Sequence, residues 1–282
     1  MAAGAYDLTT LAAVKAWLGI PDATTTSDAL LQSLLTSASR FLLNYLSRGN
    51  ILSQSYTDRF SGSGWGQTSL LLPRWPVTSI SALSISGSAI PAGVAAAANV
   101  PETSGYLLEP WDGVPAGKMQ SIDLLGYGFG CGAQNITVSY VAGYLVAGEA
   151  ATVPGVSTYT VTAAQPYGAW AADGGVVLVS SGAALTKVAT APAAGQYSVA
   201  AGVYTFNVAQ ANAAVRLSYS FIPYDLAQAC SQMVGEQYTY RSRIGIASKS
   251  LGGQETITFS QRNLTPDLRD MLQNYKNVVP FV

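Results

Sequence analysis

The sequence contains no histidine, and this absence removes the commonest general base together with the Ser-His and Cys-His nucleophilic systems. Cysteine is almost absent as well, with Cys131 and Cys230 alone. Without histidine, two cysteines cannot build a zinc site of the ordinary type. Two cysteines so far apart say little about pairing, and the default expectation is two free, partly buried thiols in a reducing cytoplasm. We therefore expect no metal site and no cofactor.

Charge is scarce. Charged residues make up 10% of the chain, against the ~25% usual for a soluble globular domain. A surface with so few charges is poorly protected against association. A drift toward small residues would give this composition, and so would a surface covered by other subunits. The net charge of −1 gives no electrostatic basis for strong DNA binding.

Long apolar runs are also missing. No stretch of about 18 or more apolar residues occurs, so no segment is expected to span a membrane. The opening MAAGAYDLTTLAAVKAWLGI lacks the basic region and apolar core of a signal peptide. The runs GSGWG (Gly62–Gly66) and GYGFGCG (Gly126–Gly132) lack the spacing of phosphate-binding loops and predict turns.

Carboxylate chemistry is the catalytic class that these absences leave open. A glycoside hydrolase needs only two carboxyl groups on opposite sides of a sugar. One aromatic-containing region holds four candidates: Glu102, Glu109, Asp112 and Asp123. Scattered carboxylates occur in nearly every protein, so we expect no catalytic residue and no enzyme, and a hydrolase is the least favoured hypothesis.

Helical periodicity marks both ends of the chain. A short helix is predicted from Thr9 or Thr10 to the Gly19-Ile20-Pro21 stop, and longer ones over Ser27–Ser47, Tyr224–Tyr240 and Pro266–Lys276. These last three are expected to pack together, with Leu34 and Leu42 in their core. The predicted apolar face of the second helix is Leu30, Leu31, Leu34, Leu35, Ala38, Phe41, Leu42, Tyr45 and Leu46. Its polar face is Gln32, Ser33, Ser37, Ser39, Arg40 and Asn44.

Between the helices the hydrophobic period changes to two, as in SQSYTDRF, PVTSISALSISG and ITVSYVAGY. Short strands with almost no charge then recur between Gly143 and Pro223, which is typical of a small antiparallel β domain. ITVSYVAGY before this block and VRLSYSF after it share one alternating pattern. We therefore predict an all-β domain, 145–215, inserted into a domain formed by 1–144 and 216–282, with VRLSYSF resuming the interrupted fold.

The predicted fold class is thus α+β. It combines a bundle of N-terminal and C-terminal helices with a β-sheet region and an inserted small antiparallel β domain.

One connection is unusually long. The stretch from Arg243 to Asn263, RIGIASKSLGGQETITFSQRN, joins two predicted helices, whereas ~2–8 residues normally suffice. Its ETITF segment alternates like a strand that could add to a neighbour's sheet edge. Basic residues outnumber acids there, which favours an acidic partner surface. A solvated loop without a partner is the alternative interpretation.

The ordered set of segments resembles the gp6-like head–tail connector (adaptor) proteins of tailed phages. The resemblance rests on DLTTLAAVKAWLGI, DALLQSLLTSASRFLLNYLSR, ILSQSYTDRFSG and LLLPRWPVTSISALSISG near the start. PYDLAQACSQMVGEQYTYRSRIGIASKSLGGQETITF and LTPDLRDMLQNYKNVV carry it at the end. The block from about Leu145 to Val215 departs from shorter members of the family.

The resemblance implies a structural virion protein of the head–tail neck, assembled in the host cytoplasm. Such adaptors form a ring, usually dodecameric, beneath the portal protein. The ring extends the DNA channel, through which the genome passes without sequence-specific binding, and it offers a platform for the stopper or tail-terminator protein. No catalytic residue is carried over.

Within that role we expect the long loop and the C-terminal tail to dock on the portal and on the adjacent subunit. The candidate docking residues are Arg243, Lys249, Leu251, Ile257, Phe259, Arg262, Val279 and Phe281. A phage-associated binding protein is the alternative function. In that case the inserted β domain would contact a host glycan through Trp170, Tyr159 or Tyr167.

Overall fold

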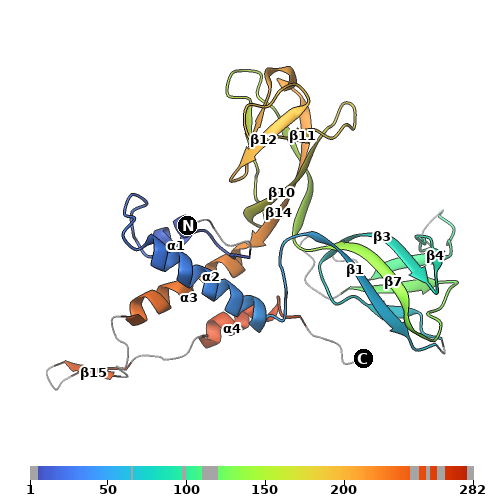
Figure 1. The fold of residues 1–282 in the computed structure, drawn as a ribbon, viewed down its shortest axis with the longest axis horizontal. Helices are drawn as coiled ribbons and strands as arrows, with labels where there is room; N and C mark the ends of the chain where they lie inside the picture. The colour runs from blue at the N-terminus through green and yellow to red at the C-terminus, as the bar shows by residue number, and fades with distance from the viewer. Residues whose placement is uncertain are drawn as a thin grey trace. The chain divides into compact units, whose positions relative to one another are not determined.

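The computed structural model describes residues 6–64, 66–96, 100–109, 120–241, 248–251, 255–258 and 264–277, with the backbone alone for 248–251 and 255–258. The fold is α+β, as predicted (Figure 1). The chain divides into one unit made of residues 1–50 and 223–276 and a second made of 51–222 and 277–282. Within the described residues, no helix is long and apolar enough to cross a membrane.

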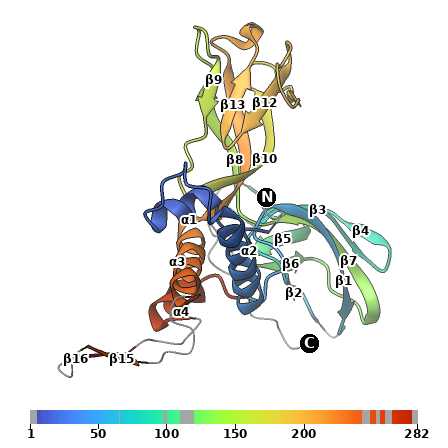
Figure 2. The ribbon, with the colours of Figure 1, turned by 60° about the vertical axis from the view of Figure 1, so that its left-hand side comes forward.

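Four helices build the first unit, which we call the helical unit: α1 (Leu11–Trp17), α2 (Asp28–Tyr45), α3 (Tyr224–Tyr240) and α4 (Pro266–Gln273). α1, α2 and α3 pack on one another, and α4 packs on α3 (Figure 2). The helices begin where the capping residues predict. The Thr10 hydroxyl accepts from the Ala13 amide at 3.2 Å, and the Thr265 hydroxyl accepts from the Leu268 amide at 3.4 Å.

The buried face of α2 is rotated from the predicted one. Leu42 is fully buried as predicted, but Leu34 is only half-buried, and Leu30 and Phe41 are exposed. Gln32 and Ser39, predicted on the polar face, are buried instead. The buried residues of the helix are Leu31, Gln32, Leu35, Ala38, Ser39, Leu42 and Leu43.

Hydrogen bonds to the segment before α1 explain why α2 buries polar side chains. The Gln32 amide donates to the Asp7 carboxylate at 2.7 Å, and the Leu8 backbone N–H donates to the Ser39 hydroxyl at 3.0 Å. Because buried polar groups are tolerated when they are hydrogen-bonded, the helix can turn this face inward. The same Ser39 hydroxyl lies 3.4 Å from the Cys230 sulfur.

Both cysteines are free thiols, as predicted. Cys230 is buried, but Cys131 is exposed rather than partly buried, because it lies in the glycine run just before the strand that begins at Gly132.

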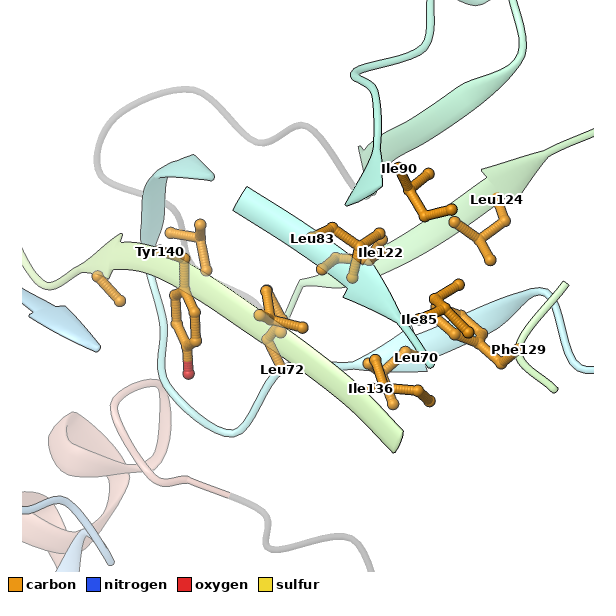
Figure 3. Close-up of a cluster of buried hydrophobic side chains, with 13 residues drawn as sticks. Leu70, Leu72, Leu83, Ile85, Ile90, Ile122, Leu124, Phe129, Ile136 and Tyr140 are labelled. Atoms are coloured by element: carbon orange, nitrogen blue, oxygen red, sulfur yellow. The ribbon is translucent and has the colours of Figure 1, made fainter. Parts of the chain in front are cut away.

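Two sheets enclose the main core of the second unit. One has the order β1 (Gln54–Gly62), β7 (Gly132–Ala142), β3 (Val77–Ile85) and β4 (Ser88–Ile90). The other has the order β2 (Ser69–Leu71), β6 (Ser121–Leu125) and β5 (Gly105–Glu109). The buried side chains come from both sheets (Figure 3): Leu70, Leu72, Val77, Leu83, Ile85, Ile90, Ile122, Leu124, Phe129, Ile136, Val138, Tyr140 and Ala142. The Trp75–Pro76 peptide bond in the bend after β2 is cis.

Seven further strands form a region that we call the β module. One sheet has the order β10 (Gly168–Leu178), β14 (Ala214–Pro223) and β8 (Leu145–Thr152). The other has the order β11 (Thr186–Lys187), β12 (Gln196–Ala200), β13 (Val203–Phe206) and β9 (Thr160–Thr162). The core of the module includes buried side chains of β12, β13 and β14: Tyr197, Tyr204, Leu217 and Tyr219.

VRLSYSF does not resume the fold interrupted after ITVSYVAGY. It lies in β14, which pairs with β8 and β10 of the module and not with β7. The alternating pattern of a strand shows which residues share a face, but it does not show which strand lies beside it. The pattern shared by the two segments therefore could not predict their pairing. The chain nevertheless enters and leaves the module at one place, because the Phe221 N–H donates to the Tyr144 carbonyl at 3.2 Å.

Candidate docking surfaces

The long connection between α3 and α4 contains a β-hairpin. β15 (Ser248–Leu251) pairs antiparallel with β16 (Glu255–Thr258), so the strand-like segment predicted from ETITF is a strand through Thr258. The register sets Lys249 opposite Ile257 and Leu251 opposite Glu255. Three predicted docking residues, Lys249, Leu251 and Ile257, therefore share one face of the hairpin. The other five, Arg243, Phe259, Arg262, Val279 and Phe281, lie outside the described residues.

Ser and Thr occupy the opposite face of this hairpin. Ser248 pairs with Thr258, and Ser250 pairs with Thr256. The hairpin is thus two-sided, with four hydroxyl residues on one face and the two apolar residues on the other, beside Lys249 and Glu255.

Polar contacts hold the start of the connection and the chain that follows α4 on the helical unit. Where the connection leaves α3, the Arg241 guanidinium lies over the Tyr238 ring, 4.2 Å from its centroid. Beyond the C-terminal end of α4, the buried Arg48 donates from Nε to the Tyr275 carbonyl at 2.7 Å. The Tyr275 hydroxyl donates in turn to Asp225 at 3.0 Å. The last residues before the C-terminal tail are therefore held on α3 and on the end of α2.

An apolar strip runs along α2 beside its buried face. We call it the α2 flank, and it consists of Leu30, Leu34, Phe41 and Tyr45. Leu30 and Phe41 are 39% and 37% exposed, and the other two are half-buried. The sequence carried a signal for it, because nine apolar positions span a wider arc of the helix than one core-facing stripe needs. Sequence reasoning assigned all nine to the core and missed this surface.

Other aromatic side chains of the helical unit are exposed as well. Trp17 on α1 is 52% exposed, and Tyr224 at the start of α3 is 53% exposed. Exposed aromatic residues are the type enriched at protein interfaces. The helical unit therefore offers candidate contact surfaces on several of its elements.

The three candidate glycan-binding residues of the β module each make a different contact within the module. The Trp170 indole N–H donates to the Tyr204 hydroxyl at 3.3 Å, inside the module. Tyr167 packs against Phe221, with 5.9 Å between ring centroids. Tyr159 is half-buried, and its carbonyl accepts from the Phe206 N–H.

The charged side chains of the β module are engaged within it. Glu149 accepts from the Ala164 N–H at 2.8 Å, and Asp173 forms an ion pair with Lys187 at 3.3 Å. Arg216 donates to the Gly148 carbonyl at 3.3 Å. With these four engaged, the module presents an almost uncharged surface.

Buried tyrosines use several of the carboxylates as hydrogen-bond acceptors. Tyr140 donates to Asp58 at 2.6 Å, and Tyr197 donates to Asp173 at 2.7 Å. Burial, followed by these bonds to carboxylates, raises the pKa of both phenols well above the ordinary value. Such carboxylates are structural acceptors rather than acids or bases poised for chemistry.

The four carboxylates considered for hydrolysis do not form a described site. Glu102 and Glu109 are exposed, Asp123 accepts from the Ser121 hydroxyl at 3.4 Å, and Asp112 lies outside the described residues. Among the side chains that the structure describes, no group of three or more His, Cys, Asp or Glu could hold a metal ion.

Comparison with known proteins gives one family match. Residues 8–66 match the model of the phage gp6-like head-tail connector protein family. The matched segment contains α1, α2 and β1, so it includes the α2 flank. It confirms the resemblance to phage head–tail connectors, which points to a structural protein. No curated protein matches the chain.

Two solved structures show weak likenesses over the whole chain. One is titled "Neck of empty GTA particle computed with C6 symmetry" and is 13% identical, with a TM-score of 0.38. The other is titled "Virion of native gene transfer agent (GTA) particle" and is 14% identical, with a TM-score of 0.36. Each match covers 100% of this chain and 95% of the other chain. Both TM-scores are below 0.5, so neither likeness shows a shared fold or mechanism.

Proposed function

We propose that this phage gp6-like head–tail connector protein is the subunit of an adaptor ring in the virion neck. The ring docks beneath the portal, extends the DNA channel and carries the stopper or tail-terminator protein. A dodecamer is the subunit number that the resemblance implies. The observation that carries the proposal is the family match over residues 8–66, which contains an α-helix with apolar side chains left outside its own core.

The α2 flank supports contact between ring subunits. Leu30 and Phe41 expose more than a third of their surface in the isolated chain. A head-to-tail ring needs two different complementary faces on each subunit, and both are uncovered in an isolated copy. The flank supplies an apolar face of this kind on the segment that defines the family.

The connection between α3 and α4, together with the C-terminal tail, supplies the second docking surface in this proposal. Arg243, Lys249 and Arg262 give it positive charge for an acidic portal surface. Leu251, Ile257, Phe259, Val279 and Phe281 give it apolar residues. The hydrogen bond from Arg48 to Tyr275 supports this role, because it fixes the chain just before the C-terminal tail.

The β module is proposed to be the inserted domain, on the outside of the ring. Because β14 belongs to it, the domain runs to about residue 220 and not only over the predicted 145–215. Its two basic side chains are Lys187, which pairs with Asp173, and Arg216, which donates to the Gly148 carbonyl, so it has little means of binding DNA phosphates. The hydrogen bond between Phe221 and Tyr144 supports an insertion, because the two chain ends meet there. We infer no enzymatic activity.

The proposal is tested by mixing the full-length chain with portal particles from the same phage and measuring the assemblies by native mass spectrometry. We expect a defined number of copies on each portal. The double variant Ile257→Asp, Phe259→Asp should lose binding. Val156→Asp, Val208→Asp is the matched control, since it adds the same charge at two exposed positions of the β module, away from the proposed docking surface. Absence of any assembly with the parent chain would refute the adaptor role.

A further inference from the structure

The edge of the sheet that begins with β1 is two-sided, as the hairpin is. In the strand order β1-β7-β3-β4, no strand lies beyond β1 among the described residues. Along the Thr57–Ser61 stretch, residues alternate between exposed and half-buried positions. Thr57, Arg59 and Ser61 are the exposed ones, and Asp58 and Phe60 are half-buried.

Two hydroxyl residues, Thr57 and Ser61, and the charged Arg59 between them form the exposed face of this edge. Thr57 lies opposite Ser139 of β7, and their hydroxyl oxygens are 3.1 Å apart. Arg59 lies opposite Thr137, which continues the polar face along β7. On the other face, Phe60 packs against the buried core, next to Ile136, its partner in the ladder.

The hairpin would continue both faces if it were added to this edge. A strand added to a sheet must place its residues on alternating faces, and a slip of one residue reverses the faces. β16 offers Thr256 and Thr258 for the hydroxyl face and Ile257 for the apolar face beside Phe60. A two-stranded hairpin alone is at best marginally stable in water, so a third strand would stabilise it.

β16 is the better strand of the hairpin for this contact. Natural edge strands are often protected from pairing by lysine, and β15 carries Lys249 whereas β16 carries no lysine. The Thr57–Ser61 stretch contains no lysine and no proline either. Both strands therefore lack lysine and proline, although Asp58 and Arg59 place charges on the β1 edge and a register shift follows Phe60.

We propose that β16 of one copy adds as a strand to the β1 edge of a second copy, along Thr57–Ser61. The proposal rests on the ring proposed above and assigns one of its subunit contacts. In a head-to-tail ring each copy would donate its hairpin to one neighbour and accept a hairpin from the other. Backbone hydrogen bonds would supply the contact, and the matching of hydroxyl and apolar faces would set its register.

Cysteine pairs placed on different copies test this contact in rings assembled on portal particles. All chains carry Cys131→Ser, so that the exposed native thiol does not react. One tagged chain carries Thr57→Cys, and a second, differently tagged chain carries Thr256→Cys, Thr258→Cys or Ile257→Cys. Residues facing each other on one side of a ladder lie close enough for a disulfide, and residues on opposite faces do not.

We expect the Thr57→Cys chain to form a mixed disulfide with Thr256→Cys or Thr258→Cys but not with Ile257→Cys. Because each chain has one engineered cysteine, only contacts between copies are detected. Rings that form without this face-dependent cross-link would overturn the strand addition and leave the adaptor role standing. Failure of any copies to gather on the portal would overturn both.

Discussion

Replacing two adjacent leucines of α2 tests the observed orientation of this helix most sharply. Leu31 is fully buried, whereas its neighbour Leu30 is 39% exposed, although the sequence pattern places both on the apolar face. The perturbation is the same in each case, a Leu→Ala change that removes three carbon atoms. Any difference in the free energy of unfolding therefore reports the environment of the two side chains.

The expected magnitudes differ because water can fill only one of the two gaps. At Leu31, burial of about 0.8 kcal/mol per carbon is lost and a cavity remains, which gives a loss of about 3 kcal/mol within the ~2–5 kcal/mol usual for such sites. At Leu30 part of the side chain is already in water and no closed cavity forms. Alanine also favours the helix slightly, so we expect a loss of about 1 kcal/mol.

Urea unfolding followed by far-ultraviolet circular dichroism measures both values. With a slope of about 2 kcal/mol per M, Leu31→Ala should lower the midpoint by about 1.5 M and Leu30→Ala by about 0.5 M. Equal shifts for the two variants, or a larger shift for Leu30→Ala, would show that Leu31 is not more buried than Leu30. That result would contradict the orientation of α2 described above.

Three further predictions follow from buried groups and from chain geometry. Burial raises the pKa of the Cys230 thiol to about 11, so near pH 8 a thiol reagent should modify Cys131 alone in the native protein and both thiols in urea. Equal rates in the native protein would contradict the burial of Cys230. Burial also raises the pKa of four tyrosines: Tyr140, Tyr197, Tyr204 and Tyr219. Below about pH 10 these phenols are protonated in both states and stability is unaffected, whereas above it the unfolded chain loses protons first, so the free energy of unfolding should fall as pH rises. Urea midpoints measured across that range would show no such fall if the phenols were solvated. Finally, deleting 145–220 and joining Tyr144 to Phe221 with a short linker should leave the helical unit folded and ring formation intact, and loss of assembly with the remainder folded would place the β module in the ring contact.

Local signals in the sequence located the helices well. Thr10 and Thr265 cap α1 and α4 as their spacing predicts, and Asp225 lies in the first turn of α3. The burial of Gln32 and Ser39 could not be predicted, because it depends on hydrogen bonds to Asp7 and to the Leu8 backbone that only the folded chain brings near.

The pairing of strands could not be predicted from the sequence for a similar reason. The alternation in VRLSYSF predicts a strand, but its neighbours β8 and β10 are chosen by packing across long separations in the chain. At the candidate docking surfaces, the connection from Arg243 to Asn263 stood out by length alone. For the α2 flank, the width of the apolar arc indicates that some apolar residues lie outside the core, but an exposed leucine and a buried one look alike in a helical pattern, so the pattern does not say which.

A cryo-electron microscopy map of portal particles mixed with the full-length chain tests the central proposal most directly. The adaptor account predicts a closed ring of copies beneath the portal, with the α2 flank covered by a neighbouring copy and the connection between α3 and α4 in contact with portal or neighbour. Portal particles that carry no ring, or separate copies whose Leu30 and Phe41 remain in solvent, would contradict it.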